Sequence, residues 1–262
     1  MKVACIQLST KSNYKNNFIK VLKFIKSAIR NGADLIITPE TTSYMSDNKK
    51  DLLKNSFEMN KDPLVKECKI IAKKEIKWIL IGSLIIKENN KLKNRSIMIG
   101  PKGKINGYYD KINMFDVNIP GGENHKESRI YKAGKKLVTI NLPWGILGLS
   151  ICYDLRFPEL YRHLSKKKIS FISVPSAFTK MTGKKHWLEL LKARAIENFC
   201  YIFAPNQFGK NTNTKETYGH SVIISPDGDI LRILKNGEGI IYAKIDPHLP
   251  KKLKKIIPSS FK

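Results

Sequence analysis

Apolar and polar residues follow one another along this chain in a pattern that predicts alternating strands and helices. Short runs rich in Ile, Val, Leu and Phe have the length of buried strands. Longer segments repeat apolar residues at helical spacing, as Phe18, Val21, Leu22, Ile25 and Ile29 do. The expected strands include 2–8, 34–40, 78–84, 95–100, 146–152 and 169–175, and the expected helices are 14–30, 62–76, 157–167 and 184–199.

The order of these segments limits the folds that the chain can adopt. Asp62 followed by Pro63 marks a helix start, as does Pro158. Strand–helix–strand units imply sheets covered by helices. Two expected antiparallel hairpins, at 95–109 and 219–245, argue against an all-parallel doubly wound sheet. Since no linker or low-complexity stretch divides the chain, we expect residues 1–262 to form a single domain.

Composition narrows the class of protein further. With 262 residues, of which 42% are hydrophobic, the chain can bury a large core. No apolar run approaches the roughly 18 residues that span a bilayer, and the N-terminus predicts a strand rather than a signal peptide. The cysteines Cys5, Cys68, Cys152 and Cys200 are far apart, which disfavours a zinc site or a disulfide framework. Free thiols suit a reducing compartment, so we expect a cytoplasmic protein. Because no long apolar run is present, we also expect that it does not bind a membrane.

The formal charge of +26 is the one unusual bulk property. Of the 48 basic residues, 41 are lysine, and they are scattered along the chain. Recognition of nucleic acid relies on arginine with interleaved aromatic residues, and neither pattern is present. We therefore expect a solvated lysine-rich surface without specific nucleic-acid binding, although the charge can attract an anionic substrate. A basic interaction protein without catalytic activity is the alternative from another class.

Cys152 is the first candidate for chemistry. It ends an apolar strand and is followed by a polar turn and a helix that opens at Pro158. This order places a thiol on a strand-to-helix turn similar to a nucleophile elbow. A thiol must lose its proton to attack a carbonyl, so it needs a base or a cation nearby. A small buried core residue is the competing interpretation for this cysteine.

Glu40 and Lys111 are two further candidates. Glu40 closes the strand 34–40 directly after Pro39, so its carboxylate lies at a strand end and could act as a general base. A cap or a loop charge is the competing interpretation of Glu40. Lys111 is one lysine among 41, and only its apolar, aromatic surroundings distinguish it.

Taken together, these segments resemble the nitrilase, or carbon–nitrogen hydrolase, superfamily. The similarity lies in TPE around Glu40, in YDKINMFDV-IPGGENHKES around Lys111, and in GLSICYDLRFPELYR around Cys152. It continues through PSAFTKMTGKKHWLELLKARAIENFCYI, TYGHSVIISPDGDIL and IDPHLPKKLKKIIP, and so covers essentially the whole chain. Six ordered blocks make the resemblance specific. The blocks are most similar to the amidases that act on deaminated glutathione or on ω-amides of α-keto acids.

The resemblance implies a fold and a mechanism. The fold is a four-layer αββα sandwich with two central mixed sheets flanked by helices, and a homodimer or higher oligomer is expected. The implied catalytic residues are Cys152 as nucleophile, Glu40 as general base and Lys111 as oxyanion stabiliser, with Glu127 orienting Lys111. The backbone N–H of Tyr153 is the expected second oxyanion donor. Neither a metal nor another cofactor is needed.

The residues that bind substrate are less marked in the sequence. Arg156, four residues after Cys152, could hold a substrate carboxylate, or it could pair with Asp154 or Glu159. Thr182 precedes the helix expected at 184–199, where backbone N–H groups favour an anion, although a simple cap is the alternative. His186 and His220 match family positions, and we expect both to be packed, hydrogen-bonded residues.

The sequence also departs from the family pattern. Asp110 and Asn113 stand where relatives usually carry Arg and His, and the segment 41–47 differs from the versions that relatives carry. We expect 41–47 to line the pocket. The prediction is hydrolysis of a small carboxylate-bearing amide to an acid and ammonia, with deaminated glutathione as the substrate. Action on ω-amides, on N-carbamoyl compounds or on nitriles is the enzymatic alternative, because the three catalytic groups alone do not choose among these carbons.

Overall fold

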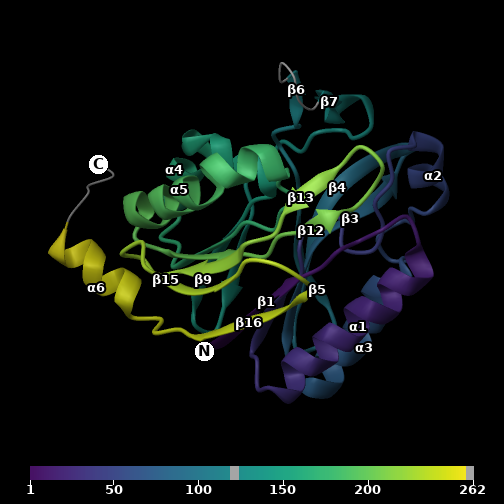
Figure 1. The fold of residues 1–262 in the computed structure, drawn as a ribbon. Coiled ribbons are helices and arrows are strands. Elements are labelled where there is room, and N and C mark those ends of the chain that lie inside the picture. Colours follow the sequence, from purple (N-terminus) through teal and green to yellow (C-terminus); the bar gives the residue numbers. More distant parts are fainter. Residues whose placement is uncertain (119–123, 258–262) are drawn as a thin grey trace.

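Two six-stranded mixed sheets lie face to face between layers of helices (Figure 1) in the computed structural model, which describes residues 1–118 and 124–257. The helices are α1 (Tyr14–Arg30), α2 (Lys49–Lys54), α3 (Pro63–Glu75), α4 (Pro158–Ser165), α5 (Lys180–Asn198) and α6 (Leu249–Ile256), with the short 3-10 helices η1 (Glu127–Arg129) and η2 (Cys152–Arg156). Helices α1 and α3 cover one sheet, and α4 and α5 cover the other. The expected four-layer arrangement is confirmed.

The first sheet has the order β16-β1-β2-β3-β4-β5. Its strands are β1 (Lys2–Gln7), β2 (Leu35–Ile37), β3 (Trp78–Glu88), β4 (Lys91–Ile99), β5 (Ile105–Asp110) and β16 (Gly239–Lys244). β1, β2 and β3 are parallel, whereas β4, β5 and β16 join in antiparallel register. The expected hairpin at 95–109 is therefore confirmed as β4–β5.

The second sheet has the order β15-β14-β11-β10-β9-β8. Its strands are β8 (Thr139–Leu142), β9 (Gly145–Leu149), β10 (Phe171–Ser173), β11 (Tyr201–Ala204), β14 (Ser221–Ile224) and β15 (Ile230–Leu234). β9, β10 and β11 are parallel in its centre. Two small hairpins lie outside the sandwich: β6 (Asp116–Asn118) with β7 (Asn124–Lys126), and β12 (Phe208–Lys210) with β13 (Glu216–Tyr218).

Strand β1 shows why the central strands read as continuous apolar runs. Val3 and Cys5 pack in the cluster between the two sheets, whereas Ala4 and Ile6 pack against the helical layer of α1 and α3. All four side chains are fully buried. Since successive side chains of a strand point to opposite faces, a strand covered on both faces must be apolar at every position.

The helix starts follow the local signals in the sequence. The Asp62 side chain accepts hydrogen bonds from the N–H groups of Leu64 and Val65, at 2.8 and 3.1 Å, and Pro63 is the first helical residue of α3. The predicted helix 14–30 is confirmed as α1, and the helix opened by Pro158 is confirmed as α4. The pattern did not indicate α2 or α6, which are short helices.

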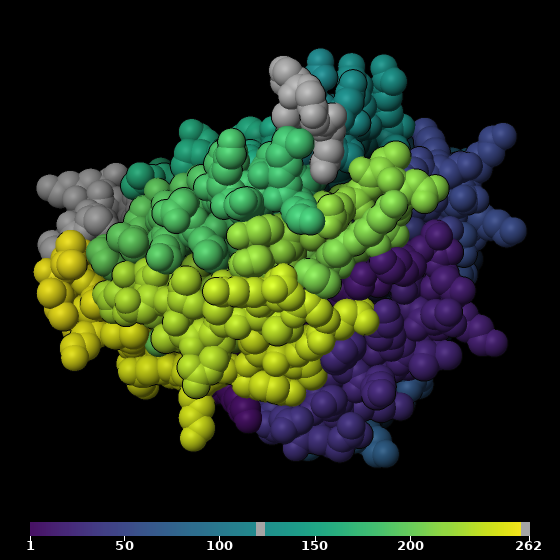
Figure 2. Space-filling model, in the orientation of Figure 1, coloured from purple at the N-terminus to yellow at the C-terminus, as the bar shows by residue number. Residues whose placement is uncertain are grey.

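The predicted hairpin at 219–245 is wrong in its second half. β14 and β15 pair in antiparallel register, but β16 leaves this sheet and pairs with β1, so that Lys2 lies opposite Lys244. Figure 1 shows β16 beside β1, and in Figure 2 the yellow C-terminal part of the chain packs against the purple N-terminal part. The apolar pattern predicts where strands occur, but it does not predict which strand pairs with which.

Three segments that directly follow strands carry the candidate catalytic groups. Glu40 follows β2, Lys111 follows β5, and Cys152 follows β9. The ends of parallel strands in α/β proteins meet at one edge of a sheet, and ligand sites gather there. Part of the block that follows Lys111, residues 119–123, lies outside the described residues, as does 258–262.

Candidate active site

Cys152 lies on a tight turn between a strand and a helix. β9 ends at Leu149, Cys152 opens η2, and α4 starts at Pro158. The φ angle of Cys152 is 48°, in the left-handed region that residues other than glycine rarely adopt. Its N–H donates to the Pro175 carbonyl at 3.0 Å, which ties the turn to the chain beyond β10. The strand, the left-handed turn and the helix reproduce the elbow that the sequence indicates.

Hydrogen bonds to the Asp154 carboxylate stabilise this turn. Its Oδ2 accepts from the Tyr109 hydroxyl at 2.7 Å and from the Ile151 N–H at 2.9 Å. Its Oδ1 accepts from the Asn113 N–H and Nδ2, at 2.9 and 2.8 Å. Asp154 is fully buried, and this burial raises its pKa against the lowering effect of the hydrogen bonds. Asn113, one of the departures from the family pattern, therefore anchors the turn that carries Cys152.

Glu40 is a buried carboxylate whose two oxygens are both occupied. Oε1 accepts from Lys111 Nζ at 2.9 Å and from Asn94 Nδ2 at 2.8 Å, and Oε2 accepts from the Ala177 N–H at 2.8 Å. Gln207 Nε2 donates to the Glu40 carbonyl at 2.8 Å and fixes the backbone. The side chain is thus held in one orientation by groups from both sheets.

Lys111 lies between two carboxylates. Its Nζ is 2.9 Å from Glu40 Oε1 and 2.8 Å from Glu127 Oε2, and its side chain is 2% exposed. The Phe115 N–H also donates to Glu127 Oε2, at 2.6 Å. Asn94 Nδ2 bridges the carboxylates through Glu127 Oε1 at 3.2 Å. Lys111 Nζ therefore donates to both carboxylate oxygens of Glu127, at 3.1 and 2.8 Å.

Burial and neighbouring charges shift the pKa values of Glu40, Cys152 and Lys111. Burial would raise the pKa of Glu40, but the positive charges of Lys111 and Lys215 lower it to about 2. Burial and the negative charge of Glu40 raise the pKa of the Cys152 thiol to about 12. Burial would lower the pKa of Lys111, but the carboxylates of Glu127 and Glu40 hold it well above its usual value. At rest, Glu40 is therefore ionised, Lys111 is an ammonium and the Cys152 thiol is protonated.

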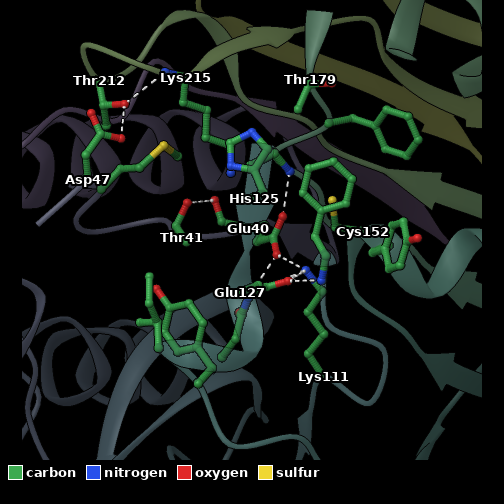
Figure 3. A pocket seen from close by; sticks show the side chains of 18 of the residues that line it. Glu40, Thr41, Asp47, Lys111, His125, Glu127, Cys152, Thr179, Thr212 and Lys215 are labelled. Carbon is green, nitrogen blue, oxygen red and sulfur yellow. Dashed lines mark hydrogen bonds and ion pairs between the residues drawn. The ribbon is translucent and has the colours of Figure 1, made fainter. Parts of the chain in front are cut away.

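A cavity of about 370 Å³ opens above these groups (Figure 3). Its walls include the three residues expected to bind substrate, Tyr153, Arg156 and Thr182, and most of the segment 41–47. The expectation that 41–47 lines the pocket is confirmed. Within residues 1–118 and 124–257, no three His, Cys, Asp or Glu side chains are grouped so that they could hold a metal ion.

Arg156 does not pair with either expected acidic residue. Its Nη1 and Nη2 each lie 3.3 Å from Nδ1 of His186, and its guanidinium lies 5.3 Å from the centre of the Phe178 ring. Asp154 instead binds the elbow. Arg156 therefore presents its charge at the cavity wall.

The expected role of Thr182 as the helix start is wrong. α5 begins at Lys180, and its N-cap residue is Thr179, so Thr182 lies inside the first turn. The hydroxyls of Thr179 and Thr182 are 2.9 Å apart. The chain therefore turns helical four residues before the apolar repeat of 184–199 indicates.

The two histidines differ from each other. His220 stacks on Tyr218 with ring centres 3.8 Å apart, and its Nδ1 lies 2.9 Å from the Tyr218 carbonyl, as expected for a packed residue. His186 is exposed at the surface, so the expectation that it is packed is wrong, although it contacts Arg156.

Two residues of the site escape the sequence reasoning. Asn94 is a buried polar residue within the apolar strand β4, and that interruption is a usable signal. Lys215 lies in the turn between β12 and β13 and lines the cavity. Nothing in the sequence distinguishes Lys215 from the many other lysines.

Similar proteins show the family to which this chain belongs. Residues 2–255 match the sequence profile of the carbon-nitrogen hydrolase family. The chain belongs to that family. It is 37% identical to the deaminated glutathione amidase of Synechocystis, over 98% of this chain and 95% of that protein. It is 33% identical to the mouse deaminated glutathione amidase, over 98% of this chain and 81% of that protein.

Solved structures agree with these relatives. The Caenorhabditis elegans NitFhit protein superimposes with a TM-score of 0.90 at 30% identity, covering 98% of this chain and 63% of that one. Saccharomyces cerevisiae Nit3, a member of branch 10 of the nitrilase superfamily, gives a TM-score of 0.88 at 28% identity, covering 99% and 95%. As a carbon–nitrogen hydrolase related to these amidases, this protein is an amidohydrolase. In the described part of the chain, no helix has both the length and the apolar character needed to cross a membrane.

Proposed function

We propose that Cys152 is the nucleophile, Glu40 the general base, and Lys111 the oxyanion stabiliser of this amidohydrolase. Because the pKa of the thiol is raised to about 12, a separate thiolate is not formed at rest. The Sγ–H proton passes to Glu40 while sulfur attacks the amide carbon. The carbonyl electron pair moves to oxygen, which accepts from Lys111 Nζ and from the N–H of Tyr153. Tyr153 is the second residue of η2, where an N–H has no acceptor within the helix.

Departure of the leaving group completes acylation, and hydrolysis of the thioester then returns the enzyme to its starting state. The tetrahedral intermediate collapses, the C–N bond breaks, and the leaving nitrogen takes the proton from Glu40. A water molecule then loses its proton to Glu40 and attacks the thioester carbon. The C–S bond breaks, and sulfur takes this proton from Glu40. Glu127 takes no part in proton transfer and keeps Lys111 in position.

The proposed substrate is deaminated glutathione. The relatives at 32–37% identity that carry the name deaminated glutathione amidase support this choice. In this compound, the scissile amide joins an acyl group to the nitrogen of cysteinylglycine. Hydrolysis therefore releases cysteinylglycine, and the ammonia expected from the sequence applies only to primary amides such as ω-amides of α-keto acids.

One observation carries this proposal. The buried group of Glu40, Lys111 and Cys152 forms the floor of a cavity whose walls also hold the cations Arg156 and Lys215. An amide that carries carboxylates matches such walls, because charge-assisted contacts at the rim fix the amide over the thiol.

The test is a substrate panel. Purified enzyme is incubated with deaminated glutathione, ω-amides of α-keto acids, an N-carbamoyl amino acid and a nitrile. Free amine and ammonia are measured separately. The expected result is the highest kcat/KM for deaminated glutathione, with cysteinylglycine as product. Faster release of ammonia from the ω-amides would select that alternative, and no hydrolysis of any carboxylate-bearing amide would contradict the proposal.

We further propose that the enzyme acts as a cytoplasmic homodimer. Cys5, Cys68, Cys152 and Cys200 are buried and unbridged, which suits a reducing compartment. Light scattering of the purified protein should give twice the mass of 29.9 kDa. A monomer at micromolar concentration would contradict the proposed assembly.

A further inference from the structure

The cations around the cavity differ in whether an acidic group already balances them. Lys111 is paired with Glu40 and Glu127. Lys126 lies opposite Asp116 in the β6–β7 hairpin. Burial would raise the pKa of that carboxyl, but hydrogen bonds from Ser128 lower it, and the charge of Lys126 adds to this lowering. In the described ranges, no ion pair involves the Lys215 ammonium or the Arg156 guanidinium. These two cations remain available to a substrate anion.

The turn that carries Lys215 is fastened to the loop after Glu40. Asp47 Oδ1 accepts from the hydroxyls of Thr212 and Thr214, at 2.7 and 2.6 Å, and Oδ2 accepts from the Thr214 N–H at 3.2 Å. The Lys215 N–H donates in turn to Thr212 Oγ1 at 3.1 Å. These bonds engage the Asp47 carboxylate with the turn itself, so Asp47 positions Lys215 and does not neutralise it.

Lys215 and Arg156 stand on different sides of the reacting groups. Figure 3 draws Lys215 and Asp47 on one side of the pocket and Cys152 on the other, with Glu40 between them. The charge of Lys215 lowers the pKa of Glu40 and opposes the raised pKa of Cys152, which agrees with an ammonium directed into the pocket. Arg156 ends the 3-10 helix that begins at Cys152, and its guanidinium lies 5.9 Å from the ring centre of Tyr153, the residue after Cys152, which puts Arg156 on the Cys152 side.

In the proposed mechanism, the acyl half of the substrate lies on the Cys152 side of the site and the leaving group on the Glu40 side. Cys152 bonds to the acyl carbon, so the acyl group extends from the sulfur. Glu40 gives its proton to the leaving nitrogen, so the leaving group must depart on the side of Glu40. Deaminated glutathione carries one carboxylate in each half, namely the α-keto acid end and the glycine end.

We propose that Lys215, positioned by Asp47, binds the carboxylate of the leaving group, while Arg156 binds the carboxylate of the acyl group. This inference rests on the proposed function. It makes Lys215 a specificity residue for substrates with an anion on each side of the scissile amide. A primary ω-amide, whose leaving group is ammonia, has no leaving-group carboxylate for Lys215 to bind.

The experiment crosses three variants with three substrates. The variants are Lys215→Met, Arg156→Met, and the control Lys210→Met, which changes an exposed lysine of the same hairpin outside this cavity. The substrates are deaminated glutathione, its C-terminal carboxamide, and N-butyryl-cysteinylglycine, which lacks the acyl-side carboxylate. Losing a charge-assisted contact should lower kcat/KM about 10- to 100-fold.

Lys215→Met should show that loss with deaminated glutathione and with the butyryl compound, but a loss within about threefold with the carboxamide. Arg156→Met should show the opposite preference between the two analogues. Lys215→Arg should recover most of the activity, and Lys210→Met should match the wild type. Melting temperatures of all variants exclude misfolding.

Two results would overturn the inference. Equal losses of Lys215→Met on the parent compound and on its carboxamide would make Lys215 a residue that acts on the reacting groups and not on the leaving-group carboxylate. No loss on either compound would remove it from the site. A wild type that hydrolyses ω-amides but not deaminated glutathione would refute the proposed substrate itself, which separates that failure from a failure of the Lys215 assignment.

Discussion

Lys111 Nζ lies 2.9 Å from Glu40 Oε1, and both side chains are less than 5% exposed. A buried ion pair of this kind contributes little net stability when intact, because both charges lose their hydration. Removing one partner of the pair destabilises the fold strongly, because the remaining charge is then buried alone. The pair therefore links the chemistry of the site to the stability of the fold.

Lys111→Met should abolish amide hydrolysis and destabilise the protein by about 3–5 kcal/mol, because it leaves Glu40 and Glu127 buried without a cation. Urea unfolding of the variant and the wild type measures the difference. Lys93→Met, which removes a lysine of β4 from a partly buried pair with Asp110, is the matched control. A Lys111→Met protein as stable as that control would refute the view that Lys111 neutralises this site.

Glu40 should make stability depend on pH at the acidic end. Its pKa in the folded protein is about 2, below the ordinary value of 4.5, so the ionised carboxylate stabilises the fold above pH 4.5. That contribution is lost as the pH falls from about 4.5 to about 2. The free energy of unfolding of the wild type, compared with Glu40→Gln across this window, should show a difference that shrinks toward pH 2. A difference that is constant over the window would contradict the lowered pKa.

Cys152 should react slowly with alkylating reagents at neutral pH. Its pKa is raised to about 12 by burial and by Glu40, so the thiol stays protonated until well above pH 9. Iodoacetamide labelling of the Cys152 peptide, followed by mass spectrometry, should rise steadily with pH and reach no plateau by about pH 9.5. A plateau near neutrality would mean that a thiolate exists before substrate binds, and it would contradict the proposed concerted proton transfer.

Asp154→Asn should loosen the elbow that carries Cys152. The carboxylate accepts from Tyr109, Asn113 and Ile151, and an amide presents N–H donors to part of this set. The expected loss is about 1–3 kcal/mol of stability together with a fall in kcat, since the thiol is displaced from Glu40. Thermal unfolding and steady-state kinetics check both effects. An unchanged kcat would show that the elbow keeps its shape without Asp154.

How much of this site the sequence predicts depends on how local the determining contacts are. Glu40 and Cys152 are visible because strand periodicity and turn residues place them at strand ends. Lys111 is identified only by resemblance, because its partners Glu40 and Glu127 come from other loops. The sequence predicts the start of α5 too late, after Thr182, because the helix starts before its apolar repeat begins.

Lys215 shows where sequence reasoning fails. Its turn is fixed by hydrogen bonds between Thr212 and Asp47, which are 165 residues apart in the sequence. No local pattern encodes such a contact. The exchange of β16 into the first sheet has the same origin, because strand pairing depends on distant partners and not on the strand's own residues.

Mass spectrometry of the intact enzyme during turnover of deaminated glutathione tests the central claim most directly. Covalent catalysis at Cys152 predicts a species heavier by the acyl group, with the added mass on the peptide that contains Cys152 and not on those with Cys5, Cys68 or Cys200. Cys152→Ala should fold normally and should show neither the adduct nor turnover. Appreciable hydrolysis by Cys152→Ala, or an adduct confined to another cysteine, would contradict the account.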